Sequence, residues 1–347
     1  MARTAAIGNQ ARRPAKVGLR RILLRPELTA VVATVVVFTY FATTAGGDGF
    51  LSLLGTRNYL EIGSYIGIIA APVTLLLVAG EFDLSVGSMV AVGQIVVAYS
   101  AVFLHWPLWA SVLVALVVGC SLGAINGLVV VKTGLPSFIV TLAALFAIRG
   151  LVQGLALATT GSSTIGAVWE ALKNDPLLGA FRGVALDLPV GVFWWVGVTL
   201  ISAWLLDRTK FGNWIYASGG NLDSAMKRGV PVQRVKVFLY MATAAASTLV
   251  GALSMLAINQ ADVNAAMGRE FEVVTASVIG GALLTGGYGS PIGAAFGALL
   301  FGMVVQGFFF TNIPDQWYQV FLGAMLLIAV LVNKYVRQLA LRPLRRT

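Results

Sequence analysis

The stretch LWASVLVALVVGCSLGAINGLVVV (108–131) runs for 24 residues without a charge. One crossing of a bilayer takes about 20 consecutive apolar residues, so this run alone is long enough to span a membrane. It is one of ten such runs, each bounded by charges or by Gly and Pro clusters. They lie near 28–45, 60–79, 85–103, 108–131, 137–158, 189–206, 236–258, 272–284, 290–310 and 317–335. The sequence therefore predicts an all-α polytopic membrane protein of about ten transmembrane helices.

The composition agrees with this prediction. Of the 347 residues, 58% are hydrophobic and only 11% are charged, whereas soluble domains are about 45–50% apolar and about 25% charged. Soluble globular and intrinsically disordered classes are therefore excluded. The net charge of +10 could indicate a nucleic-acid partner, but Lys and Arg in cytoplasmic loops account for it in a membrane protein. We expect the lipid bilayer and no nucleic acid as a partner.

The distribution of basic residues predicts the orientation. Of the 24 Lys and Arg residues, 19 lie on one side of the ten runs and four on the other. Because cytoplasmic loops carry the excess of basic residues, both termini are predicted to be cytoplasmic. This gives a basic cytoplasmic arm over 1–27, a transmembrane domain over 28–335 and a basic cytoplasmic tail over 336–347. A signal peptide cleaved near 42–45 is the alternative for the first run, which the long basic arm opposes.

Several classes of chemistry lack the residues they need. Cys120 is the only cysteine and His105 the only histidine, which leaves no material for a disulfide, a thiolate or histidine metal cluster, or a Ser-His-Asp triad. The chain has no G-x-x-x-x-G-K-[ST] sequence and hence no P-loop. We therefore predict no catalytic residue, no metal site and no cofactor in this chain, which argues against a membrane-embedded enzyme.

An acidic turn lies between the second and third runs. Charged groups at membrane depth are costly and face a cavity, a partner or the interface. Glu81, Asp83 and Ser85 stand in GEFDLSVGS (80–88) and are predicted to form a structural or gating turn. Asp83 is expected to cap a helix that begins at Leu84; proton carriage is the alternative.

Neutral polar residues occur within several runs. They could line a path for an uncharged hydroxylated solute, or they could form hydrogen bonds between helices. These candidates are Gln94, Asn126, Gln153, Asn259 and Gln306.

Glycines recur every fourth residue at 119, 123 and 127, and again at 289, 293 and 297. This spacing favours close packing of helices in a membrane, with a sliding surface as the alternative. The segments 80–88 and 286–293 also form a weak repeat, each a glycine-rich turn before an apolar run.

The inner segment 207–235 contains a short helix with clear start and stop signals. Asn221 is a plausible N-cap for a helix over 222–228, and Gly229 followed by Pro231 predicts its end. A capped helix that projects from a membrane protein could dock another subunit. The alternative is an ordinary amphipathic loop.

Four blocks of the sequence resemble one family in order and spacing. The blocks are GEFDLSVGS (80–88), NGLVVVKTGLPSFIVTLAALFAIRGL (126–151), FGNWIYASGGNLDSAMKRGVPVQRVK (211–236) and EFEVVTASVIGGALLTGGYGSPIGAAFGALL (270–300). The family is the membrane-spanning permease subunit of ribose/xylose/galactose-type ABC sugar importers. The sequence departs from the usual pattern of this family at two places. Glu81-Phe82 stands where Gly-Ile is commoner, and Ser224-Ala225-Met226 stands where the family often has two small apolar residues.

The resemblance implies a set of partners and a docking loop. The partners are a second permease copy or a paralogue, cytoplasmic ABC ATPase subunits that bind ATP and Mg²⁺, and a periplasmic solute-binding protein. It also implies that Gly219, Gly220, Asn221, Ala225 and Gly229 belong to the loop that docks on the ATPase. The chain would then be a multi-pass permease of the bacterial inner membrane, with residues 28–335 as its permease domain.

The expected function is ATP-powered import of a sugar or polyol. One alternative is an ABC permease for a nucleoside, an autoinducer-like sugar or a branched-chain amino acid. Another is an ion-coupled secondary transporter, which the scarcity of intramembrane carboxylates opposes. The sequence leaves open which solute is carried and whether two copies or two paralogues pair.

Overall fold

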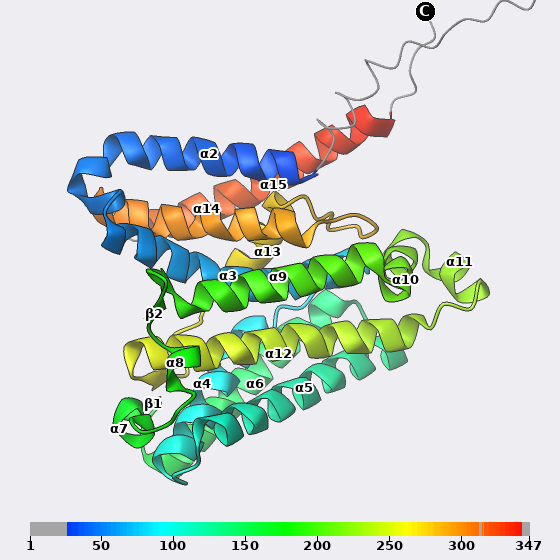
Figure 1. Cartoon of the computed structure of the whole chain (residues 1–347). Coiled ribbons are helices and arrows are strands. Elements are labelled where there is room, and N and C mark those ends of the chain that lie inside the picture. The colour runs from blue at the N-terminus through cyan, green and yellow to red at the C-terminus, as the bar shows by residue number, and fades with distance from the viewer. Residues whose placement is uncertain (1–25, 312–313, 315, 342–347) are drawn as a thin grey trace, which may run out of the picture.

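The computed structural model describes residues 26–341 except 312, 313 and 315, and it shows a helical bundle (Figure 1). Each of the ten apolar runs coincides with one helix, so the all-α prediction is confirmed. These helices are α2 (Pro26–Thr44), α3 (Leu53–Val78), α4 (Val86–Val102), α5 (Leu108–Thr133), α6 (Ser137–Thr160), α9 (Val190–Arg208), α12 (Val232–Ile258), α13 (Arg269–Ile279), α14 (Pro291–Phe310) and α15 (Gln316–Leu341).

The helices differ in their capacity to cross a membrane. In the described part of the chain, seven are long and apolar enough to span it, and Val86–Val102 and Gln316–Val332 are shorter apolar helices. Helix α13 has 11 residues, about 16 Å at 1.5 Å per residue, roughly half of the hydrocarbon core of about 30 Å. The predicted span near 272–284 is therefore corrected to a half-length helix. Glycines cause this, because Gly268 and Gly281, which flank α13, both have positive φ.

The bundle has two distinct ends. One end carries α10 (Lys210–Gly220) and α11 (Leu222–Lys227) and is called the α11 face. The other end is called the α7 face and carries short elements: the π-helical turn η1 (Gly46–Phe50), α7 (Val168–Leu172), α8 (Leu178–Phe181), and the two-stranded antiparallel sheets β1 (Thr164–Ile165) with β4 (Ala261–Asp262) and β2 (Val184–Ala185) with β3 (Leu188–Pro189). The start of α2 and the end of α15 both lie toward the α11 face (Figure 1).

The predicted terminal segments fall largely outside the description. Residues 1–25 of the basic arm and 342–347 of the basic tail are not among the described residues. Helix α15 continues to Leu341, beyond the predicted end of the transmembrane domain at residue 335. The last predicted run and the first part of the predicted tail therefore form one helix.

Helix α3 lies at the centre of the bundle, where 83% of its most apolar window is buried. It packs against α9, α12, α13 and α14. The glycine stripes lie at such contacts: a Cβ on Gly123 would approach the Tyr240 carbonyl oxygen to 2.5 Å, and one on Gly297 would overlap the Ala276 carbonyl oxygen. The close-packing interpretation of both stripes is confirmed, because only glycine lets these backbones come so near.

Candidate functional site

Three glycine-bearing segments meet at the α11 face. A Cβ on Gly286 would lie 2.9 Å from both the Gly219 carbonyl oxygen and the Gly80 Cα. A Cβ on Gly219 would overlap the Val78 carbonyl oxygen. The Gly287 N–H donates to that same Val78 oxygen at 2.8 Å. We call this contact of 80, 219–220 and 286–287 the glycine junction, and it joins the end of α3 to the end of α10.

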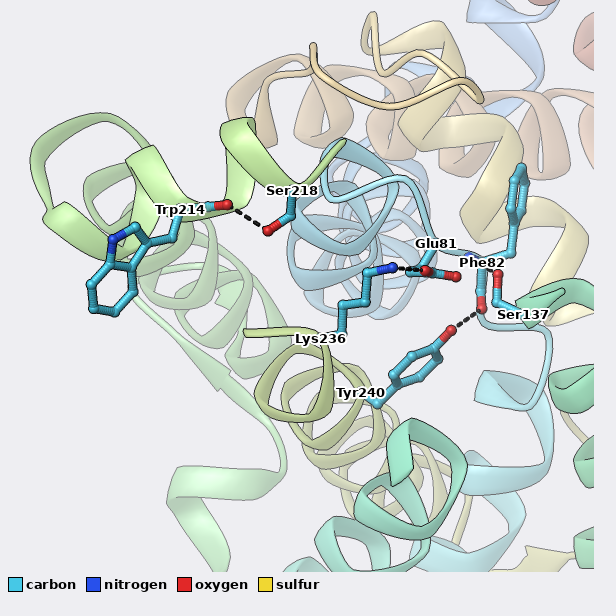
Figure 2. Close-up of polar contacts among 7 residues, drawn as sticks. All are labelled: Glu81, Phe82, Ser137, Trp214, Ser218, Lys236 and Tyr240. Atoms are coloured by element: carbon cyan, nitrogen blue, oxygen red, sulfur yellow. Dashed lines mark hydrogen bonds and ion pairs between the residues drawn. The ribbon is translucent and has the colours of Figure 1, made fainter. Parts of the chain in front are cut away.

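The acidic turn predicted at Glu81, Asp83 and Ser85 follows directly, and one side of α12 holds it. Lys236 forms an ion pair with Glu81, and the Tyr240 hydroxyl donates to the Phe82 carbonyl oxygen at 3.0 Å (Figure 2). The Thr243 hydroxyl donates to Asp83 Oδ2 at 2.6 Å. The spacing of four and three residues places these three α12 side chains on one face, so each meets a successive residue of the turn.

Asp83 is 1% exposed and has partners on both carboxylate oxygens. Its Oδ1 accepts from the Ser85 N–H at 2.9 Å and from the Ser85 hydroxyl at 2.6 Å. Helix α4 begins at Val86 with Ser85 as its N-cap residue, and no side chain bonds its first N–H groups. The expectation that Asp83 caps a helix beginning at Leu84 is therefore wrong. Its carboxylate closes an Asx-type turn instead, since the backbone turns before the helix starts.

Two further residues tie the turn to α5 and α6. Asn126 Nδ2 donates to the Ser85 hydroxyl oxygen at 3.0 Å. The Phe82 N–H donates to Ser137 Oγ at 3.0 Å (Figure 2). With the glycine junction, parts of all four sequence blocks that carry the family resemblance meet in this region. Sequence analysis missed the partners Lys236, Tyr240, Thr243 and Ser137. The spacing of Lys236, Tyr240 and Thr243 along one helix was the available signal.

The predicted short helix forms as α11, with the caps that the sequence indicates. Asn221 Oδ1 accepts from the Ser224 N–H at 2.9 Å, which confirms the N-cap. At the other end the Val230 N–H donates to the Ala225 carbonyl at 3.1 Å and the Gly229 N–H to the Met226 carbonyl at 3.0 Å. Together with φ +79° at Gly229, these bonds form a Schellman motif.

The docking residues named from the resemblance differ in exposure. Ala225 is 4% exposed, so its methyl group is buried. The large apolar side chains that α11 exposes are Leu222 and Met226, at 42% and 49%. Gly219 is packed in the glycine junction, whereas a Cβ on Gly220 would meet nothing within 4 Å.

A groove of about 530 Å³ lies beside α11. Leu222 and Met226 form one side, and the ion-paired Glu81 and Lys236 also line it. Residues 134–138, between α5 and α6, are part of its lining. The α11 face thus combines projecting apolar side chains with a neighbouring groove whose charged groups are paired.

Two cavities with both polar and apolar lining residues lie toward the α7 face. We call the cavity of about 730 Å³ the upper chamber and the cavity of about 450 Å³ the lower chamber. Both are lined by Asn58, Glu61, Tyr65 and Ala257, so one leads into the other. The lower chamber is lined in addition by Gln94, Ser254, Arg269 and Gln306, among others.

The structure brings together two of the five predicted path residues, Gln94 and Gln306, in the lower chamber. Gln94 Oε1 accepts from the Asp262 N–H at 2.8 Å, and its Nε2 donates to Ser254 Oγ at 3.1 Å. Asn126 belongs to the acidic turn instead. Asn259 ends α12 with φ +60° and accepts from the Trp169 N–H at 2.7 Å, which anchors α7. Gln153 lies on α6 and lines neither chamber.

Within residues 26–341, apart from the gaps, no group of three or more His, Cys, Asp or Glu side chains gathers to hold a metal ion. The groups that do gather are amides, hydroxyls and ion pairs. Such groups hold neutral polar molecules and connect helices through hydrogen bonds.

Comparison with known proteins gives a consistent picture. The family described as "Branched-chain amino acid transport system / permease component" matches residues 55–330. The xylose transport system permease protein XylH of Escherichia coli (strain K12) is 31% identical over 92% of this chain and 94% of its own length. The ribose import permease protein RbsC of the same strain is 30% identical over 88% and 93%. The inner membrane ABC transporter permease protein YjfF is 31% identical over 82% and 85%. No solved structure matches the chain.

Proposed function

The chain belongs to the branched-chain amino acid transport system / permease component family, and on this premise we propose that it is the permease subunit of a binding-protein-dependent ABC importer that carries a sugar or polyol across the inner membrane. The observation that carries the solute class is the similarity, over nearly the whole chain, to permeases named for xylose and ribose. The family description alone would favour a branched-chain amino acid, which is the second candidate.

The chemistry inside the bundle favours a neutral polar solute moved without coupled protons. Gln94, Gln306 and Asn58 line the lower chamber, and amides offer both donors and acceptors to hydroxyl groups. Asp83, the buried carboxylate at the α11 face, is occupied by Ser85 and Thr243. A proton carrier must exchange such bonds during each cycle, so this supports a passive role for Asp83 and an external source of energy.

We place the ATPase at the α11 face and the solute-binding protein at the α7 face. ATP and Mg²⁺ then belong to the ATPase, and this chain needs no cofactor. A second copy of the chain or a paralogue completes the membrane part. This assignment makes the α11 face cytoplasmic, in agreement with five Lys and Arg residues in 207–235.

Leu222 and Met226 are the proposed contacts with the ATPase, because they are the large apolar side chains that α11 exposes. Ala225 is buried on α11 and, in this proposal, does not contact the ATPase itself. Helix α11 leads through Gly229 into α12, which holds the acidic turn through Lys236, Tyr240 and Thr243. A push on α11 is thereby passed to the start of α4 without any nucleotide site in this chain.

Docking is tested by co-purification of the ATPase with charged variants of α11. Leu222→Asp and Met226→Asp together should reduce the bound ATPase at least tenfold, with the permease still in the membrane. Ser224→Asp is the matched control, since Ser224 is exposed on the same helix. Full ATPase binding by the double variant would mean that α11 is only a connector.

The proposed orientation is tested by labelling. Ser224→Cys on α11 and Asn174→Cys beyond α7 are exposed positions, to be placed in a Cys120→Ala background. Impermeant maleimide should reach position 174 from the periplasm and position 224 only after the membrane is opened. Labelling of both from the same side would contradict the proposed topology.

The function itself is tested by reconstitution. The chain, its ATPase and its binding protein are placed in proteoliposomes, and uptake of labelled xylose, ribose and leucine is measured with and without ATP. We expect ATP-dependent uptake of a pentose and none of leucine. Uptake driven by a proton or sodium gradient without ATP would overturn the ABC assignment, and uptake of leucine alone would overturn the solute class.

A further inference from the structure

We propose that the lower chamber is a solute-binding site inside a single copy of the chain, and that it takes a neutral polyhydroxylated molecule on its way from the α7 face. This proposal rests on the function proposed above. It adds where the solute is held and which side chains hold it.

The chamber has the position and size of a binding site. It lies among α3, α4, α12 and α14, with Ala265, Ala266 and Arg269 at the start of α13 closing one side. Its volume of about 450 Å³ falls within the range of about 300–1,000 Å³ for ligand sites. The upper chamber of about 730 Å³ shares four lining residues with it and gives a route from the α7 face.

Polar groups in the chamber are left without protein partners. Gln306 is 6% exposed, lines the chamber, and makes no hydrogen bond to another described residue. The same holds for the Asn58 amide, which is half-buried. Glu61 uses one oxygen to accept from the Tyr65 hydroxyl at 2.7 Å, which leaves the second. The Gln306 amide therefore borders the space of the chamber, where a ligand can reach it.

Next to the chamber, two buried side chains of opposite charge, Arg149 and Glu270, interact electrostatically but leave several atoms without a hydrogen bond. Arg149 is 9% exposed with Nε and Nη2 unbonded, and Glu270 is 4% exposed with Oε2 unbonded. Both approach Gly87, where a Cβ would overlap Glu270 Oε2 and lie 3.4 Å from Arg149 Nη2. A Cβ there would also lie 2.9 Å from the carbonyl oxygen of Ala266, a residue of the chamber lining. Polar atoms without a hydrogen bond are therefore found not only in the chamber but also between the chamber and the acidic turn.

These groups suit hydroxyl groups better than an ion or an apolar molecule. A sugar hydroxyl both donates and accepts, and amides together with a free carboxylate oxygen offer both complements. Both charged lining residues already have a protein partner: Arg269 pairs with Glu272 at 2.8 Å, and Glu61 accepts from the Tyr65 hydroxyl at 2.7 Å. Interhelical bonding is the other use of such amides, and Gln306 forms no such bond.

The test compares two glutamines that differ in place but not in kind. Gln306→Leu removes the amide from the chamber, and Gln153→Leu removes one from α6 outside both chambers. Gln153 is also partly buried and has no hydrogen bond to another described residue, so the two variants share their cost in packing. Each is assembled with the ATPase and the binding protein in proteoliposomes, and pentose uptake and binding-protein-stimulated ATP hydrolysis are measured together.

We expect Gln306→Leu to lower uptake at least fivefold with ATP hydrolysis within twofold of wild type, and Gln153→Leu to leave both within twofold. Should Gln306→Leu fail to insert, Asn58→Leu at the other end of the chamber takes its place, with the same expected pattern. In a second measurement, Gln306→Cys in the Cys120→Ala background is labelled by a small thiol reagent from the α7 face. Added pentose should slow this labelling at least threefold.

Two results would overturn the assignment of the lower chamber as a solute-binding site and leave the importer assignment intact. One is uptake by Gln306→Leu and Asn58→Leu equal to that of wild type. The other is labelling of Gln306→Cys that pentose does not slow. Slowed labelling by leucine and not by pentose would overturn the solute class. Absence of ATP-dependent uptake in the wild-type assembly would instead overturn the proposed function, and this inference with it.

Discussion

The acidic turn and the lower chamber are both polar regions within an apolar bundle, but they differ in how completely their groups are paired. Asp83 in the turn is 1% exposed and accepts three hydrogen bonds. Gln306 in the chamber is 6% exposed and Glu270 beside it 4% exposed, yet Gln306 has no hydrogen bond to another described residue, and Glu270 Oε2 accepts no hydrogen bond. Paired groups stabilise and orient a fold, whereas unpaired ones raise its free energy until a ligand meets them. We therefore assign the turn to architecture and the chamber to the solute.

The largest expected effect comes from the glycine junction that precedes the turn. Gly219→Val should abolish accumulation in the membrane, because its Cβ would overlap the Val78 carbonyl oxygen and approach Gly287 N to 2.8 Å. Gly220→Ala is the matched control, since nothing lies within 4 Å of its Cβ. Immunoblots of membrane fractions and size-exclusion profiles measure both. Normal levels of Gly219→Val would show that the junction can open.

Within the turn, Asp83→Leu should be the next most damaging change. It leaves the Ser85 N–H and hydroxyl and the Thr243 hydroxyl without their acceptor, at about 1–3 kcal/mol for each group that finds no other partner. Asp83→Asn keeps an acceptor for Ser85 and should retain most of the uptake. Thermal unfolding in detergent and ATP-dependent uptake distinguish the two. Equal loss of uptake in both variants, with stability retained in Asn, would instead support proton carriage.

The ion pair between Lys236 and Glu81 should rank third. Their side chains are 13% and 11% exposed, and removal of one partner of a buried pair costs about 3–5 kcal/mol, less where water still reaches it. Lys236→Met should therefore lower the unfolding temperature clearly. The double variant Lys236→Met with Glu81→Gln should recover a large part of that loss. A double variant as unstable as the single one would mean that Lys236 contributes through packing alone.

The smallest effect on stability is expected in the chamber. Gln306→Leu replaces an amide that has no hydrogen bond to a described residue by an apolar group of similar size, so no bond within the chain is lost and the change in stability is small. We expect an unfolding temperature equal to or slightly above that of wild type, although uptake falls. A marked loss of stability would show that Gln306 supports the fold, and the contrast between turn and chamber would not hold.

Much of the fold was accessible from local sequence. Each of the ten apolar runs became a helix, and the N-cap Asn221 and the stop at Gly229 are as predicted. The four blocks also indicated the permease family, which the comparisons confirm. Two local expectations were wrong. Helix α13 is half the length of a span, and Asp83 does not cap α4, because glycines and an Asx-type turn set the helix starts there.

The candidate site could be predicted only in part. Glu81, Asp83 and Ser85 do form a turn, and Gln94 and Gln306 do share a chamber. For Asn126 the solute path and an interhelical hydrogen bond were both open, and the structure shows the bond to Ser85; Ala225, predicted in the docking loop, is buried. The polarity of a residue in an apolar run is visible in the sequence, while its direction around the helix relative to neighbours is not.

The sequence by itself determined the membrane class, the helices, the caps of α11 and the family, because these depend on the length and order of contiguous residues. Only the tertiary structure decided which polar groups are paired. Lys236 meets Glu81 across 155 residues and Thr243 meets Asp83 across 160, whereas Gln306 meets no described partner. Such pairing depends on the angle and register at which distant helices pack. Those are set by the close approach of glycine-bearing backbones throughout the bundle, which no single segment of the chain encodes.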